Sequence, residues 1–129
     1  MKILGIDYGR RKIGIAIGDT QTLMAEPLMT VNNFKFLILN LKSILNDQMI
    51  KKIVIGIPGG KIQAEIKKFG QEVKKETGVS VEYFDETLTT QDAQEILIAS
   101  GRKRKSRKEK EDSVAAAIML QLFIESHPC

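Results

Sequence analysis

Three acidic positions in this sequence stand where a carboxylate could do chemistry instead of only meeting solvent. Asp7 ends a short apolar run, the pair Asp85 and Glu86 ends another, and Asp112 opens an alanine-rich segment. Carboxylates crowded at the edge of a buried layer repel one another, and desolvation adds to the cost unless a cation lies between them. If the fold brings these acids together, we therefore expect them to share a bound metal.

The cation that such a site favours is Mg²⁺ or Mn²⁺, because both prefer oxygen ligands. The only histidine and the only cysteine are His127 and Cys129. Ser-His-Asp triads, Cys-His pairs and histidine-rich zinc sites are not expected here, because each needs a histidine held inside the fold and His127 lies two residues from the end of the sequence. Two ions roughly 4 Å apart can clamp the attacking and leaving oxygens of a phosphodiester. Phosphoryl transfer with two such ions is therefore the predicted chemistry.

Each acid also has an ordinary structural interpretation. Asp7 could be an Asx-turn residue beside Gly9, and Asp112 could be a helix cap that favours the macrodipole. Asp85 and Glu86 could be a polar exit from a strand. Three independent coincidences are less plausible than one site, so we favour a shared site.

A strongly basic segment precedes the last acid. Residues 102–110 carry seven basic side chains and one acid, a local charge of +6, whereas the whole chain has a formal net charge of +4. Basic side chains beside the acids could neutralise the phosphates that flank a scissile bond, although such a run can also be a solvated connector. The residues predicted to contact nucleic acid are Arg10, Arg11, Lys12, Arg102, Lys103, Arg104, Lys105 and Arg107.

The hydrophobic pattern places these residues on an α/β framework. Apolar or alternating runs predict strands at 3–6, 12–18, 23–31, 52–57 and 79–84. Pro27 makes the third of these an edge or bulged strand. Helical spacing predicts helices at 34–49, 61–77, 112–125 and from Thr89 or Thr90 to Ser100, with a loop or frayed turn at 102–110. Three antiparallel strands followed by two parallel crossover strands give a mixed sheet with helices on both faces.

Length and composition are those of one globular domain over residues 1–129. The chain is 43% hydrophobic and 28% charged, which excludes a disordered or fibrous protein. No apolar run approaches the roughly 18 residues that a bilayer requires. We therefore expect a cytoplasmic protein with no membrane partner.

Four segments carry a resemblance to a known family: GIDYGRRKIGIAIGD, IVIGIPGG, YFDETLTTQDAQEIL and EDSVAAAIMLQLFI. In this order they resemble motifs of the YqgF family, the pre-16S rRNA nucleases related to Holliday junction resolvases. The resemblance implies an RNase H-like fold, with Asp7, Glu86 and Asp112 as catalytic metal ligands and Asp85 as a catalytic neighbour of Glu86. It also implies metal-dependent endonucleolytic cleavage in maturation of the 5′ end of bacterial 16S rRNA.

Two departures from the family pattern bear on substrate positioning. Thr87 stands where the family has an arginine, and the loop at 58–61 is short. The alternatives are a Holliday-junction-type DNA resolvase and a non-catalytic RNA-binding or transcription-associated module. Actin-like sugar kinases share the Asp-x-Gly opening, but they need a second domain, for which 129 residues leave no room. The expected partner is structured RNA or branched DNA, and the expected state is a monomer or a homodimer.

Overall fold

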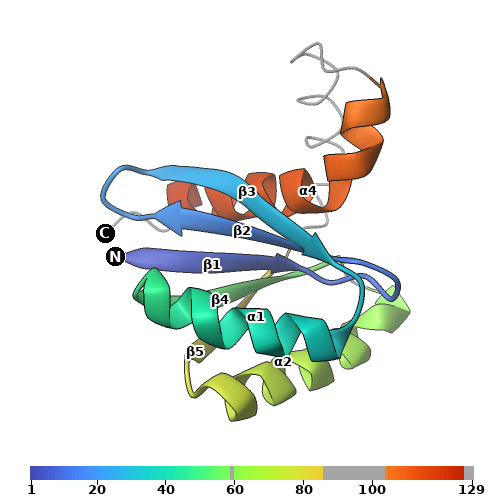
Figure 1. Ribbon diagram of the computed structural model, residues 1–129, viewed down its shortest axis with the longest axis horizontal. Helices are drawn as coiled ribbons and strands as arrows, with labels where there is room; N and C mark the ends of the chain where they lie inside the picture. Colours follow the sequence, from blue (N-terminus) through green and yellow to red (C-terminus); the bar gives the residue numbers. More distant parts are fainter. Residues whose placement is uncertain (59, 86–103, 127–129) are drawn as a thin grey trace.

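The computed structural model describes residues 1–58, 60–85 and 104–126, the last segment with its side chains from residue 112 onward. The strands are β1 (Lys2–Asp7), β2 (Ile13–Asp19), β3 (Met24–Val31), β4 (Ile50–Ile57) and β5 (Ser80–Asp85). They form one sheet in the order β3-β2-β1-β4-β5 (Figure 1). β2 pairs antiparallel with both β1 and β3, whereas the β1–β4 and β4–β5 pairs are parallel. The predicted mixed sheet is confirmed.

Helices cover both faces of this sheet, as predicted. α1 (Phe34–Asp47) and α2 (Gln63–Thr77), which follows the short 3-10 turn η1 (Gly60–Ile62), lie on one face, and α4 (Arg104–Ser126) lies on the other (Figure 1). The helix predicted to end at Ser100, together with Glu86, lies outside the described residues. Along the part of the chain that the structure describes, no helix combines the length and apolarity needed to cross a membrane.

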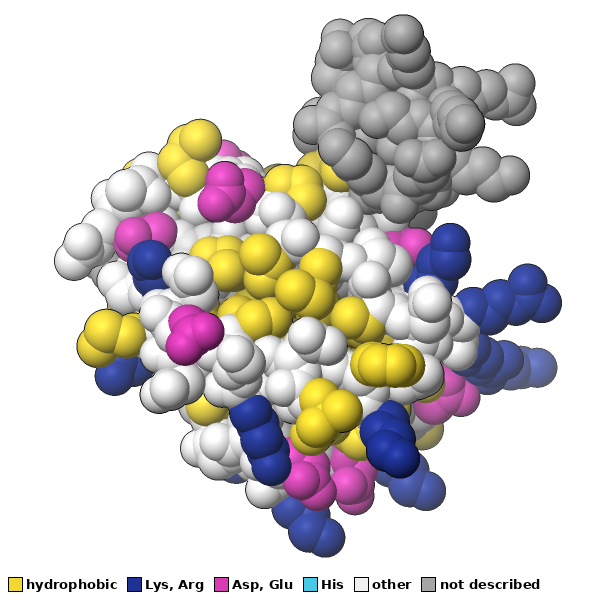
Figure 2. Space-filling model, viewed as in Figure 1, with side chains coloured by type: hydrophobic (Ala, Val, Ile, Leu, Met, Phe, Trp, Pro, Cys, Tyr) yellow, Lys and Arg dark blue, Asp and Glu magenta, His cyan; other side chains and the backbone are white. Residues whose placement is uncertain are grey.

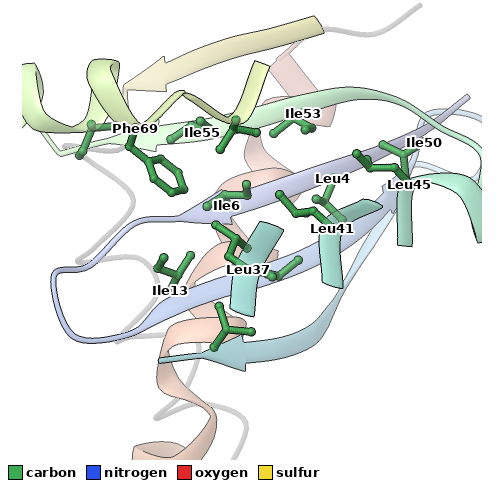
Figure 3. Close-up of a cluster of buried hydrophobic side chains, with 14 residues drawn as sticks. Leu4, Ile6, Ile13, Leu37, Leu41, Leu45, Ile50, Ile53, Ile55 and Phe69 are labelled. Atoms are coloured by element: carbon green, nitrogen blue, oxygen red, sulfur yellow. The ribbon is translucent and has the colours of Figure 1, made fainter. Parts of the chain in front are cut away.

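The larger core lies between the sheet and the α1–α2 layer. Leu37, Leu41 and Leu45 recur every four residues along α1 and are buried against the sheet (Figure 3). They meet Leu4 and Ile6 of β1, which point to this face because successive strand side chains alternate. This period-two alternation fixes which strand residues face which helical layer.

Local residues set the boundaries of α1 and α2. The side chain of Asn33 accepts a hydrogen bond of 2.9 Å from the backbone amide of Phe36, which caps the start of α1. Gly78 ends α2 in the left-handed conformation, with φ of 72°. The predicted glycine cap of this helix is therefore confirmed.

The second core depends on a glycine-rich surface that lets α4 approach the sheet closely. Leu120 of α4 packs directly over Gly5, and a Cβ built at Gly18 would lie 2.8 Å from Cδ1 of Ile124. At Gly14 a Cβ would collide with the backbone carbonyl of Asp112. The α4 backbone can therefore rest on β2 only because a side chain is missing there.

The predicted loop at 102–110 is wrong for most of its length. α4 begins at Arg104, eight residues before Asp112, and continues without interruption to Ser126. The run from 102 to 126 contains neither glycine nor proline, and lysine, arginine and glutamate are good helix formers. Once the apolar half of the helix docks on the sheet, nothing in the sequence stops it from extending toward its N-terminal side.

Pro27 lies on the edge strand, as predicted. β3 pairs only with β2 in the described residues, and Pro27 stands opposite Ala16 where the register shifts after Ile15. A proline on an edge strand can direct its missing N–H away from the ladder, so the pairing with β2 survives.

We predict that Gly14→Ala destabilises the protein more than Gly18→Ala. The added methyl at position 14 meets backbone, which cannot move alone, whereas at position 18 it meets flexible ends of Leu120 and Ile124. Overpacking of this kind costs about 1 to 3 kcal/mol, and the position 14 variant should lie at or above the upper end. Chemical denaturation measures both. Equal losses would show that α4 adjusts freely over β2.

Candidate active site

Two of the predicted acids end strands at the same edge of the sheet. β1, β4 and β5 run parallel, Ile6 pairs with Ile55, and Ile57 pairs with Asp85, so their carboxyl ends meet at one edge. Asp7 is the last residue of β1 and is half-buried. This is the edge at which open α/β sheets place their sites.

The pleat separates Asp85 from Asp7. Asp7 continues the series of Ile3 and Gly5, which faces α4, because residues two apart share a face. Asp85 instead continues the series of Tyr83, which packs in the α1–α2 core, and is exposed. Its strand also lies two strands away, on the order of 10 Å at the backbone. Asp85 therefore lies on the side of the sheet opposite α4.

Asp112 is brought to the side of the sheet on which Asp7 lies. Its backbone carbonyl rests on Gly14, and Gly14 is the register partner of Asp7. Its side chain is half-buried, and the next residue, Ser113, is buried. The backbone of Asp112, 105 positions after Asp7 in the sequence, thus lies over the register partner of Asp7.

The helix-cap interpretation of Asp112 is wrong. Only the first four N–H groups of a helix lack an internal partner. α4 begins at Arg104, so Asp112 lies in its third turn, beyond the reach of those groups. The position of this acid is therefore explained by the approach of α4 to β2 and not by capping.

Of the three predicted metal ligands, the described residues include Asp7 and Asp112. The described residues contain no group of three histidine, cysteine or acidic residues that could hold a metal ion. Asp7 and Asp112 offer carboxylate oxygens, the donors that Mg²⁺ and Mn²⁺ prefer. Glu86, the third predicted ligand, lies outside the described residues. The two acids fit such a cation by chemistry and leave at least one ligand to be supplied.

Comparison with known proteins decides the family. Residues 1–126 match the family described as "RuvX: Holliday junction resolvase". The chain belongs to the RuvX family. A relative from Clostridioides difficile, named "Putative pre-16S rRNA nuclease", is 35% identical over 96% of this chain and 94% of its own length. A relative of the same name from Rickettsia conorii is 33% identical over 96% of this chain and 86% of its own length.

Solved structures confirm the predicted RNase H-like fold of this RuvX chain. Thermus thermophilus RuvC in complex with a Holliday junction substrate matches with a TM-score of 0.63 and 17% identity, over 99% of this chain and 97% of that chain. The fowlpox virus Holliday junction resolvase matches with a TM-score of 0.59 and 15% identity, over 98% and 100%. At this identity the likeness concerns the fold. The RuvX family is one of nucleases, so the chain is a hydrolase acting on phosphodiester bonds.

Basic residues of this RuvX chain lie in the turn that follows Asp7. Arg10, Arg11 and Lys12 are exposed, and Lys and Arg side chains project where the β1–β2 turn lies (Figure 2). Gly9 makes the turn possible, since a Cβ there would lie 2.5 Å from the carbonyl oxygen of Lys12. Of the basic run, Arg104, Lys105 and Arg107 belong to the first two turns of α4, and Arg102 and Lys103 lie outside the described residues.

A hydrogen-bonded group next to this turn was missed by the sequence analysis. The hydroxyl of Tyr8 donates to Oε2 of Glu65 at 2.6 Å, and Nε of Arg10 lies 3.3 Å from Oε1 of Glu65. The hydrogen bond from Tyr8 lowers the pKa of Glu65, and burial raises the pKa of Tyr8. Glu65 is in the first turn of α2, 57 positions from Tyr8, and nothing in the spacing indicates this pairing.

We predict that Glu65→Gln lowers the melting temperature at neutral pH and that this gap closes in acid. The pKa of Glu65 is lowered in the folded protein, so its contribution is present above the ordinary value of 4.5 and is lost as pH falls through the folded pKa. Thermal melts from pH 7 down to about pH 3 measure the gap. In a Tyr8→Phe background, which lacks the donor, the gap should be smaller at pH 7. A gap that is constant with pH would contradict the pairing.

Proposed function

We propose that this RuvX chain is a metal-dependent endonuclease whose metal ligands are Asp7, Glu86 and Asp112. The observation that carries the proposal is the contact of the Asp112 backbone with Gly14, beside Asp7. Two half-buried acids on this face do not stabilise the fold, because removing a charged group from water is unfavourable. A divalent cation, in contrast, requires carboxylate ligands of this kind. Glu86 is proposed as the third ligand from the family motif alone.

Bound Mg²⁺ or Mn²⁺, one ion or two, would supply stabilisation of the charge that develops on the phosphate and a more acidic attacking water. The chain itself holds the acids in place. β1 ends at Asp7, and the contact of α4 with Gly14 positions Asp112 over β2. The basic residues of the turn and of α4 would bind the phosphates on either side of the scissile bond.

The substrate that we propose is the precursor of 16S rRNA, cleaved in maturation of its 5′ end in the cytoplasm. Support comes from the name that the relatives carry, and these relatives cover nearly the whole of this chain. Branched DNA is the second candidate, because the family is described as a Holliday junction resolvase and the matching RuvC structure contains a Holliday junction substrate.

We predict that Asp7→Asn reduces cleavage in Mg²⁺ or Mn²⁺ at least a hundredfold, whereas Asp85→Asn reduces it less than tenfold; both figures are order-of-magnitude expectations for losing, or keeping, a metal ligand. Both acids end strands at the same sheet edge, but they lie on opposite faces. Asp85→Asn is therefore a matched control. The assay is cleavage of structured RNA and of four-way DNA junctions by the purified full-length chain.

Two results would contradict this assignment. Equal losses for the two variants would restore Asp85 to the catalytic set beside Asp7. No cleavage of either substrate, together with retained binding, would favour the non-catalytic RNA-binding module.

Asp7→Asn should melt at the same temperature as the wild type or slightly higher without metal, because it relieves repulsion between the acids.

We predict that neutralising Arg102, Lys103, Arg104 and Lys105 weakens binding of all nucleic acids alike and flattens its salt dependence. Each lost phosphate contact removes about 0.7 to 0.9 from the slope of log affinity against log salt, so four contacts remove roughly three. Titrations at several salt concentrations measure the slope.

A matched control neutralises four lysines at the opposite edge of the sheet, where β1, β4 and β5 begin. These are Lys2, Lys51, Lys74 and Lys75. Their removal changes the net charge equally and should leave most of the slope intact. Equal slopes for the two variants would mean that only net charge matters and that the basic run is a solvated segment.

A further inference from the structure

Three aromatic rings gather beside the β1–β2 turn, on the face of the sheet opposite α4. The ring centroids of Tyr8 and Phe69 are 4.7 Å apart, and those of Phe34 and Phe69 are 5.6 Å apart in an edge-to-face arrangement. The chain has only two tyrosines, five phenylalanines and no tryptophan. Three of its seven aromatic residues therefore meet at one place, contributed by β1's end, the start of α1 and the middle of α2.

The rings form part of the wall of a shallow surface cavity of about 260 Å³ that is open to solvent. It is lined by Tyr8, Phe34, Glu65, Lys68, Phe69 and Glu72. Phe69 is 7% exposed and belongs to the core, but Phe34 is 36% exposed and leaves part of its ring open to the cavity. The cavity thus has apolar walls and a rim that carries both carboxylates and an ammonium group.

Exposed cations lie next to this cavity, in the turn that follows Asp7. Arg10 is held at its rim by Glu65, with a side chain that is 70% exposed, and Arg11 and Lys12 follow in the same exposed turn. Tyr8 directly follows Asp7, and consecutive Cα atoms are about 3.8 Å apart. A nucleic-acid strand held by this turn would therefore pass the cavity within reach of the scissile phosphate.

We propose that this cavity takes one unpaired nucleobase from a single-stranded segment next to the cleavage site. Flat aromatic walls together with phosphate-binding cations are the features by which proteins hold single strands, and every base can stack on them. The carboxylates of Glu65 and Glu72 add acceptors for base amino and imino hydrogens. A paired base cannot enter, so the cavity selects substrates with an unpaired nucleotide at this position. The inference rests on the proposed function, because it assumes that nucleic acid binds at Asp7.

The test compares Phe34→Leu with Phe36→Leu in the full-length chain. Phe36 lies on the same helix, is 58% exposed and does not line the cavity, so it is a matched control. Binding is measured with chelator present, to a short single-stranded RNA that carries one 2-aminopurine, and to the same strand in a perfect duplex. Phe34→Leu should weaken single-strand binding roughly tenfold, the size of one lost base–aromatic stack, and should abolish the quenching of 2-aminopurine.

Two further results keep the test decisive. Phe34→Tyr, which retains a ring, should bind like the wild type, and this holds even if Phe34→Leu melts earlier. Phe36→Leu should bind like the wild type, and duplex binding should not respond to any of the three variants. Equal effects of Phe34→Leu and Phe36→Leu, or failure of Phe34→Tyr to restore affinity, would overturn the proposal.

The failures of the two proposals can be told apart. If the protein cleaves nucleic acid with Mg²⁺ but Phe34→Leu binds single strands normally, the cavity does not hold a base and the proposed nuclease stands. If Phe34→Leu alone weakens single-strand binding but no cleavage occurs, the cavity stands and the nuclease fails.

Discussion

The close approach of α4 to β2 is the constraint on which the rest of this structure depends. A helix backbone can rest on a strand only where the strand has no side chain, and Gly14 provides that gap under Asp112. Gly5 and Gly18 let Leu120 and Ile124 pack in the same shallow layer. The surface formed by these three glycines therefore determines how the second core packs. It also determines how closely Asp112 of α4 approaches the β1–β2 pair. The absence of side chains at these glycines thus governs both the packing of α4 and the position of its acid.

The two faces of the sheet carry different parts of the proposed nuclease. The face under α4 holds Asp7 and Asp112, and the opposite face holds Tyr8, Glu65 and the aromatic cavity. Because consecutive residues of a strand point to opposite faces, a single step along the chain passes from one to the other. A bound strand of nucleic acid would therefore wrap around the sheet edge, with its phosphate on one side and a base on the other.

Much of the fold follows from the sequence because strands and helices are set by local patterns. The alternating and continuous apolar runs predict all five strands, and Gly78 predicts the end of α2. The start of α4 was missed because the basic run has no apolar period, although its residues favour helix.

The site was predictable in outline only. Strand ends locate Asp7 and Asp85 at one edge, but whether the two side chains share a face depends on the register between β4 and β5, which a sequence does not reveal. The pairing of Tyr8 with Glu65 joins residues 57 positions apart and depends on how α2 packs, so no local sequence pattern indicates it.

The position of Pro27 limits how copies of this protein can associate. β3 is one of the two terminal strands of the sheet in the described part of the chain, and Met24 and Leu28 are exposed on it, 65% and 40%. An unprotected apolar edge would invite another strand to extend the ladder. Pro27 has no N–H to offer, and the shift of register beside it breaks the regular spacing of the backbone groups. A dimer built on this side would be joined by side chains, and the sheet would stop at each protomer's own edge.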